Sequence, residues 1–468
     1  MQGPHQRDSG ARRRLCGTVS RFFGELDLSG KSLIPGPGAA DFVWATGIED
    51  TFVPQARQGH RGLDEYELID HYGHWREDLA LARAVGARAV RWGVPWYRVE
   101  PRPGELDWRW TDQVIPYLVE ELGLTPIVDL MHYGCPLWLE REFANPGYPQ
   151  AVAAYAGAFA RRYAGLVRRY TPLNEPLVNA LFCGKRGLWP PYLRGDRGYV
   201  RVMLQLVRGI LATVAEIKAI DPGAVMVHVE ATGLARAARA DLQALAAEDQ
   251  RRGFLAYDLL TGRVDGDHPL FPWLVRNGAG PDELAALTRE PLALDLLGLN
   301  FYPQWSTRQL YVGRGGQLAY RSVEQDGAGF QALIGDYHRR YRVPVLVTET
   351  SARGPLAVRA RWLEASVAAI RELRAAGVPV LGYTWFPLFT MVDWRYRFGS
   401  RAAERYRLEL GLFTLRGEIG GAGAADGSAD GRWAPTPLAE RFRAFTADPL
   451  AAVGELAPEG GPPAGPRA

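Results

Sequence analysis

The chain has 468 residues, of which 47% are hydrophobic and 23% charged, with 55 Lys and Arg against 52 Asp and Glu. This composition is typical of a globular protein with a large core, and the net charge of +3 does not favour nucleic acid or a membrane surface as a partner. No apolar run approaches the ~18 residues of a membrane-spanning helix. The cysteines Cys16, Cys135 and Cys183 are too widely spaced for a zinc motif or a disulfide framework, which favours a cytoplasmic protein.

From Asp41 onward, short apolar runs alternate with amphipathic segments. The apolar runs predict eight strands, at 42–46, 87–92, 125–130, 166–173, 224–230, 294–302, 344–348 and 379–385. Apolar residues at steps of three and four predict helices at 72–85, 110–122, 152–170, 202–220, 237–260, 281–289, 330–341, 362–376 and 438–445. Near-continuous apolar strands indicate a parallel sheet covered by helices. This regular alternation of strands and helices predicts an α/β fold. We expect one (β/α)8 barrel over 41–448, and a doubly wound sheet is the alternative.

Three segments lack this alternation of predicted strands and helices. Residues 1–40 are rich in Gly, Pro, Arg and Ser, and predict a flexible N-terminal extension. Residues 417–432 are rich in Gly, Ala and Asp, and predict a flexible loop. Residues 449–468 contain repeated Gly and Pro, which is typical of a disordered tail.

Every predicted strand ends in polar or aromatic residues, and this favours the barrel. The carboxyl ends of barrel strands lie on one face, where the active sites of such barrels are built. Among these residues, Glu175 follows the fourth strand and Glu349 ends the seventh. The others at strand ends are Glu49, Arg91, His132, Asn174, Glu230, Asn300, Tyr302 and Trp385.

Two carboxylates facing each other across a sugar are the minimum apparatus for cleaving a glycosidic bond. We expect Glu175 to donate a proton to the leaving oxygen, which requires a raised pKa, and Glu349 to attack the anomeric carbon or activate water. Arg91 is the candidate to keep Glu349 ionised, and Tyr302 to hydrogen-bond it. His71 and His74 lack a third metal ligand, so we expect a helix surface there, and neither a metal nor a cofactor.

Asn174-Glu175-Pro176 and Thr348-Glu349 resemble the acid/base and nucleophile motifs of glycoside hydrolase family 1, the β-glucosidase family. Further similar segments lie between about residues 41 and 413, at 74–101, 129–139, 298–302, 382–385 and 392–394. The resemblance implies a retaining β-glycosidase that forms a covalent glycosyl-enzyme, with carboxyl groups about 5–5.5 Å apart. It also implies that substrate contacts come from Glu49, Arg91, His132, Asn174, Asn300, Tyr302, Trp385, Asp393 and Trp394.

This chain departs from the family pattern around the sugar pocket. The family's Thr-Glu-Asn-Gly is Thr348-Glu349-Thr350-Ser351, its first-strand Gln corresponds to Glu49, and the Glu of its Phe-Glu-Trp is Asp393. The sugar therefore stays open. The segments around 184–197 and 303–320 are interpreted as short loops, which leave the aglycone open, and the sequence does not indicate the oligomeric state. Three alternatives to the β-glucosidase-like hydrolase also remain: a non-catalytic sugar-binding barrel, an endo-acting glycanase, and a 6-phospho-β-glycosidase using Arg395 and Arg397.

Overall fold

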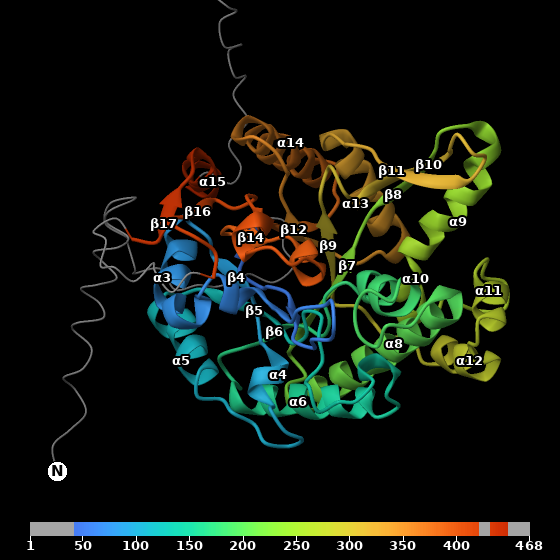
Figure 1. Ribbon diagram of the computed structural model, residues 1–468, viewed down its shortest axis with the longest axis horizontal. Coiled ribbons are helices and arrows are strands. Elements are labelled where there is room, and N and C mark those ends of the chain that lie inside the picture. The colour runs from blue at the N-terminus through green and yellow to red at the C-terminus, as the bar shows by residue number, and fades with distance from the viewer. Residues whose placement is uncertain (1–41, 421–430, 448–468) are drawn as a thin grey trace, which may run out of the picture.

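The computed structural model describes residues 42–420 and 431–447 (Figure 1). The extension predicted at 1–40, the tail predicted at 449–468 and most of the loop predicted at 417–432 lie outside the described residues. Among the described helices, none is both long enough and apolar enough to cross a membrane.

Eight parallel strands form a closed barrel. Pairing of β1 with both β13 (Val43 opposite Gly382) and β4 (Ala45 opposite Ala89) closes the ring, which confirms the (β/α)8 barrel and excludes the doubly wound sheet. In order around the barrel, the strands are β1 Val43–Gly47, β4 Ala89–Gly93, β5 Thr125–Asp129, β6 Arg169–Thr171, β7 Val225–Ala231, β9 Leu296–Phe301, β12 Val345–Thr350 and β13 Val380–Trp385.

Helices surround the strands (Figure 1). The α-helices of eight or more residues are α3 His71–Ala84, α6 Tyr148–Arg162, α8 Gly195–Ile220, α9 Gln243–Gly253, α12 Pro281–Arg289, α13 Gly327–Tyr341, α14 Leu356–Ala375 and α15 Pro437–Ala447. The shorter ones are α2 Glu65–Leu68, α4 Trp96–Val99, α5 Thr111–Pro116, α7 Pro176–Asn179, α10 Leu255–Leu260 and α11 Phe271–Arg276. Two π-helices (η1 Tyr117–Glu121, η3 Ala180–Lys185) and four 3-10 helices (η2 Glu142–Ala144, η4 Ala240–Leu242, η5 Trp394–Phe398, η6 Ala403–Tyr406) complete the set.

Two predicted helices differ from the structure. The helix predicted at 152–170 ends at Arg162, because the chain turns at Gly165 (φ +85°) and then enters β6. The helix predicted at 237–260 contains the end of β8 (Leu234–Ala237), then η4, α9 and α10.

The segment 303–320 was interpreted as a loop, but it contains β10 (Thr307–Val312) and the start of β11 (Leu318–Ser322). These two strands form a three-stranded sheet with β8, which lies beside α9 at the edge of the barrel (Figure 1). Three small two-stranded sheets also escaped prediction: β2 Phe52–Val53 with β3 Leu63–Asp64, β14 Met391–Val392 with β15 Arg407–Leu408, and β16 Phe413–Leu415 with β17 Trp433–Pro435.

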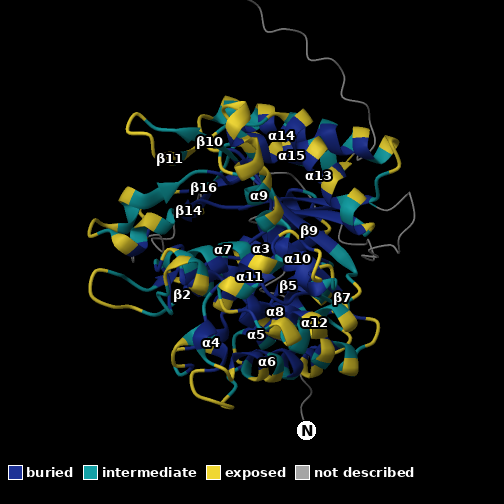
Figure 2. Cartoon of the chain, turned by 90° about the vertical axis from the view of Figure 1, so that its right-hand side faces the viewer, coloured by how far each residue is buried: buried dark blue, intermediate teal, exposed yellow. Residues whose placement is uncertain are grey.

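The barrel interior changes from apolar to charged toward the carboxyl ends of the strands. Side chains two residues apart on a strand point to the same side. On β4 the inner Ala89 is followed by Arg91, and on β5 Ile127 is followed by Asp129. An apolar cluster from five strands fills the lower interior: Val43, Ala45, Ala89, Ile127, Val227, Val229 and Leu346. The buried interior and the exposed outer helices are visible in Figure 2. The fold therefore places a layer of charged groups at the carboxyl face.

Candidate active site

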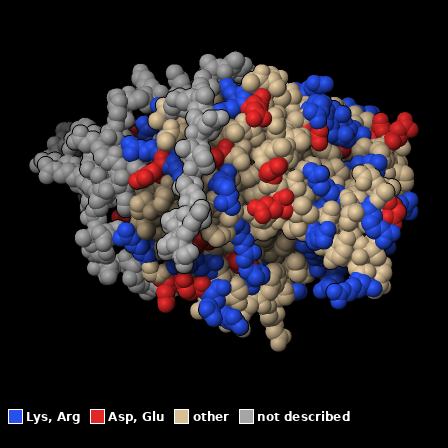
Figure 3. Space-filling model, turned by 90° about the horizontal axis from the view of Figure 1, so that it is seen from above, with Lys and Arg blue, Asp and Glu red and all other residues tan. Residues whose placement is uncertain are grey.

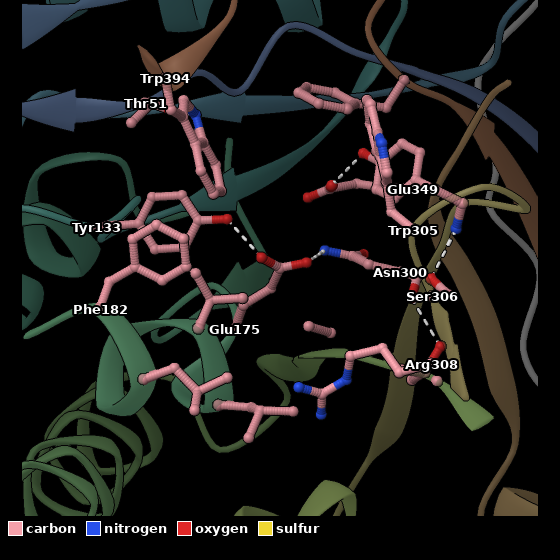
Figure 4. Close-up of a pocket in the computed structure, with 18 of the residues that line it drawn as sticks. Thr51, Tyr133, Glu175, Phe182, Asn300, Trp305, Ser306, Arg308, Glu349 and Trp394 are labelled. Carbon is pink, nitrogen blue, oxygen red and sulfur yellow. Dashed lines mark hydrogen bonds between the residues drawn. The ribbon is translucent and has the colours of Figure 1, made fainter. Parts of the chain in front are cut away.

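A cavity of about 650 Å³ opens at the carboxyl ends of the barrel strands. Its volume lies within the ~300–1,000 Å³ that is usual for small-molecule sites. Glu175 and Glu349 both line it, together with Tyr133, Asn300 and Tyr302. Figure 4 shows the two carboxyl groups and the side chains around them. The two acids that lie 174 positions apart in the sequence are thus brought to one site.

The backbone around Glu175 is held firmly. Glu175 has a left-handed conformation (φ +50°, ψ 69°), which is costly for a residue other than glycine. Pro176 starts α7 directly after it, and the Asn179 amide donates to the carbonyl oxygens of Asn174 (3.0 Å) and Glu175 (3.3 Å). The Glu230 carboxylate accepts from the backbone N–H of Leu177 at 3.1 and 3.2 Å. These contacts fix the direction in which the Glu175 side chain enters the cavity.

The environment of Glu175 favours its protonated form at neutral pH. Burial, followed by the negative charge of Glu349, raises its pKa to about 8. The Tyr133 hydroxyl donates to Glu175 Oε2 at 2.5 Å, and the Asn300 amide donates to Oε1 at 2.9 Å. Both donors stabilise the ionised form and offset only part of the burial effect. This environment suits a general acid.

Glu349 has the opposite environment. It lies near the end of β12, where it pairs with Asn300 of β9. Arg91 Nη1 donates to Glu349 Oε1 at 3.0 Å, and the Tyr302 hydroxyl donates to Oε2 at 2.6 Å. One partner is a buried cation and the other a phenol, so this carboxylate is held as an anion with both oxygens oriented.

Arg91 lies at the centre of the charged layer and is fully buried. Its guanidinium lies 2.6 Å from Glu49 Oε1 and 2.5 Å from Asp129 Oδ2, in addition to its contact with Glu349. Burial raises the pKa of Glu49 well above its usual range, whereas for Asp129 the effect of burial is outweighed by Arg91 and His132, which lower its pKa. One guanidinium is therefore shared between three carboxyl groups, those of Glu49, Asp129 and Glu349.

Five of the predicted substrate contacts line the cavity: His132, Asn300, Tyr302, Asp393 and Trp394. His132 is oriented by Asp129, whose Oδ2 lies 3.0 Å from its Nδ1. The Trp394 indole N–H donates to Thr51 Oγ1 at 3.0 Å, and the Asp393 carboxylate pairs with Arg395 at 2.8 Å.

The other four predicted contacts, Glu49, Arg91, Asn174 and Trp385, are fully buried and are not among the lining residues. Each is engaged by neighbours behind the wall. The Asn174 amide donates to Tyr133 Oη (3.0 Å) and lies 3.1 Å from His132 Nε2. The Trp385 indole donates to the carbonyl of Leu410 at 3.1 Å.

Several lining residues were missed by sequence reasoning. Tyr133 follows His132 at the end of the third predicted strand, and this position could have predicted it as a lining residue. Trp305 and Arg308 belong to the segment that was interpreted as a loop. Phe182 and Arg186 lie in and just after η3, whose π-helical geometry has no simple sequence signal.

The arginines considered for a sugar phosphate already have partners. Arg397 is buried, and its guanidinium donates to the carbonyl oxygens of Val53 (2.9 Å) and Gln55 (2.7 Å). Arg395 is paired with Asp393 as described above. These contacts do not favour the 6-phospho-β-glycosidase. In the described part of the chain, no group of three or more His, Cys, Asp and Glu side chains could hold a metal ion.

Comparison with known proteins agrees with this geometry. The model of glycosyl hydrolase family 1 matches residues 45–303. Beta-glucosidase A of Thermotoga maritima is 23% identical over 359 residues, covering 71% of this chain and 80% of that protein. A bifunctional beta-D-glucosidase/beta-D-fucosidase of Bifidobacterium breve is 33% identical over 150 residues, covering 28% of this chain and 31% of that protein.

The structure of the family 1 β-glucosidase from Thermotoga maritima in complex with isofagomine lactam superposes with a TM-score of 0.71 at 18% identity. This superposition covers 87% of this chain and 97% of that one, and it supports the barrel fold. The family match spans more than half of the 468 residues and includes Glu175. The chain therefore belongs to glycosyl hydrolase family 1 and is a glycoside hydrolase.

Proposed function

We propose that the protein is a retaining β-glycosidase of the β-glucosidase type, with Glu175 as acid/base and Glu349 as nucleophile. One observation carries the proposal: the two carboxyl groups have opposite environments in one cavity. Burial keeps Glu175 protonated, whereas Glu349 is bound by Arg91 and Tyr302. Pairs of acids with such separated protonation states are characteristic of glycosidases.

In the first step, Glu349 attacks the anomeric carbon and forms an ester with the sugar. The bond from this carbon to the glycosidic oxygen breaks, and the Glu175 proton goes to that oxygen, so that an alcohol leaves. Esterification removes the Glu349 charge, which is one of the causes that raise the Glu175 pKa. The pKa of Glu175 therefore falls once the intermediate has formed.

In the second step, Glu175 acts as a base. It takes a proton from water, whose oxygen attacks the anomeric carbon and breaks the ester to Glu349. Two displacements at the same carbon retain its configuration. Glu175 ends protonated and Glu349 ionised, so the starting state is restored.

The sugar itself is proposed to lie between Glu349 and Trp394, with hydroxyl contacts from His132, Asn300 and Asp393. The Trp394 ring offers an apolar face for the C–H groups of a pyranose. Related proteins named as β-glucosidases support a β-glucoside as the first substrate class to test.

Glu349 is held in the chain by contacts of both of its neighbours, which supports the hydrolase over a non-catalytic barrel. The Thr350 hydroxyl donates to the carbonyl of Phe301 at 2.6 Å, and the Thr348 hydroxyl donates to Asn300 Oδ1 at 2.6 Å. Both neighbours of Glu349 are thus bound to β9, the strand that also supplies Asn300.

A panel of chromogenic aryl β-glycosides tests the proposal. The wild-type protein should hydrolyse at least one of them, and ¹H NMR should detect the β-anomer of the sugar first. Glu349→Ala should abolish turnover, and Glu175→Ala should lower it by about 10²–10⁴-fold. Glu120→Ala, at an exposed residue of η1, is the matched control. A wild-type protein that binds sugars but hydrolyses none would instead be a binding barrel, and a first-formed α-anomer would mean inversion.

A further inference from the structure

We propose that the leaving-group side of the cavity is a subsite for an aromatic aglycone that carries an anionic group, which Arg186 and Arg308 bind. This inference rests on the proposed glycosidase function and specifies its substrate class. The anionic group is a carboxylate or sulfate, because a guanidinium binds two oxygens of such an oxyanion through paired N–H donors.

The two arginines lie on the correct side of the acid. Both line the cavity, Arg186 just after η3 and Arg308 on β10. In Figure 4, Arg308 lies on one side of Glu175, with Trp394 and Glu349 on the other. A general acid protonates the leaving oxygen, so the aglycone extends from Glu175 away from the nucleophile. That direction leads to Arg308.

The charges of these arginines are not neutralised by the described chain. Within residues 42–420 and 431–447, no carboxylate oxygen lies within 4.0 Å of either guanidinium. Arg186 lies 5.5 Å from the Phe182 ring centroid, and Arg308 lies 5.5 Å from that of Tyr320. The nearby carboxylate of Asp249 is engaged by Arg252 at 3.3 Å.

The two cations also act on each other. Burial, followed by the positive charge of Arg308, lowers the pKa of Arg186. Two like charges that face one cavity repel, and an anion placed between them would relieve the repulsion. By contrast, other charged residues of this region are paired: Lys185 with Asp196 at 2.7 Å, and Arg252 with Asp249. Arg186 and Arg308 thus differ from these neighbours in having no carboxylate partner among the described residues.

The walls beside the arginines are apolar and aromatic. Leu177, Val178, Leu181 and Phe182 come from α7 and η3, and Trp305 comes from the segment before β10. Figure 4 shows Phe182 and Trp305 on opposite sides of Glu175. A flat ring fits such walls better than a further sugar, whose hydroxyls would need polar partners. Aromatic walls with two free cations therefore favour an aryl anion over an oligosaccharide.

The test compares two nearly isosteric leaving groups, 3-carboxyphenyl and 3-carbamoylphenyl, on the sugar that the wild type accepts. The ratio of kcat/KM for the charged over the neutral substrate is measured in the wild type and in the Arg186→Gln/Arg308→Gln double variant. Dividing one ratio by the other cancels the intrinsic difference between the leaving groups. We expect the ratio to fall about tenfold in the double variant, as for the loss of charge-assisted hydrogen bonds. Arg236→Gln on β8, exposed and outside the cavity, should leave the ratio unchanged.

A binding measurement keeps the inference separate from the proposed catalysis. Dissociation constants of 3-hydroxybenzoate and 3-hydroxybenzamide, obtained from quenching of tryptophan fluorescence, should show the same preference in the wild type and its loss in the double variant. Circular dichroism checks folding, and Arg186→Gln alone replaces the double variant if that does not fold. If no glycoside is hydrolysed but the preference in binding persists, the proposed function fails and the anionic subsite stands. Equal preferences in wild type and variant, in both measurements, would overturn the subsite.

Discussion

Replacing Tyr133 with Phe should move the alkaline limit of activity to higher pH. The Tyr133 hydroxyl donates to Glu175 Oε2 at 2.5 Å inside the protein. This bond stabilises the ionised carboxylate and so lowers the Glu175 pKa. The Tyr133→Phe variant loses this hydrogen bond, whereas the aromatic ring still occupies the same space. The active form of free enzyme has Glu175 protonated, so a higher pKa extends activity to higher pH.

The size of the change follows from the kind of bond that is lost. A hydrogen bond to a charged group contributes about 1.5–3 kcal/mol, and one pKa unit corresponds to about 1.4 kcal/mol. The Asn300 amide at 2.9 Å from Oε1 remains and compensates in part. We therefore expect the descending limb of kcat/KM to move by about one pH unit, from near the Glu175 pKa of about 8 to about pH 9.

The assay is kcat/KM for a chromogenic β-glycoside between pH 5 and pH 10, with folding checked at each pH. Tyr97→Phe, outside the cavity lining, is the matched control and should leave the limb in place. A limb that stays near pH 8 in Tyr133→Phe, or moves to lower pH, would refute the reasoning that Glu175 is the titrating acid and Tyr133 its donor.

Three further predictions concern the buried charges. Glu349→Gln should lower the Glu175 pKa, because it removes a negative neighbour, and ¹³C NMR of labelled glutamate measures this directly. Arg91→Met should lower the free energy of unfolding by about 3–5 kcal/mol in urea titrations, because it leaves buried carboxylates unpaired. Burial raises the Glu65 pKa from 4.5 to about 7, so its folded state loses stability as pH rises between these values. Glu65→Gln should abolish that loss, roughly 3 kcal/mol in wild type; equal pH profiles in denaturation would contradict this.

Local sequence signals were sufficient for the barrel and for its two acids. Glu175 lies shortly after β6 and Glu349 lies near the end of β12, so their position at the carboxyl face follows from topology alone. The contacts of Tyr302 and Arg91 with Glu349 were also predicted, because strand ends meet at that face. Charged side chains are dispersed over the face seen in Figure 3, in keeping with the small net charge.

What escaped prediction depends on contacts between distant segments. Arg308 belongs to β10, which pairs with β8 about 70 residues earlier, and only this pairing brings its side chain to the cavity. Whether a strand-end residue faces the cavity or lies behind its wall also cannot be decided locally. Glu49 lies behind the wall because Arg91 binds it there, and Trp385 because Leu410 accepts its indole N–H. These partners are set by packing in three dimensions.

The central claim is that Glu349 becomes covalently attached to the sugar. Incubation with a 2-deoxy-2-fluoro-β-glycoside that has a good leaving group, followed by mass spectrometry of the intact protein and of its peptides, tests this directly. The account predicts one sugar per chain, attached to the peptide that contains Glu349, and no attachment in Glu349→Gln. A sugar attached to another residue, or hydrolysis that releases the α-anomer first with no adduct, would contradict it.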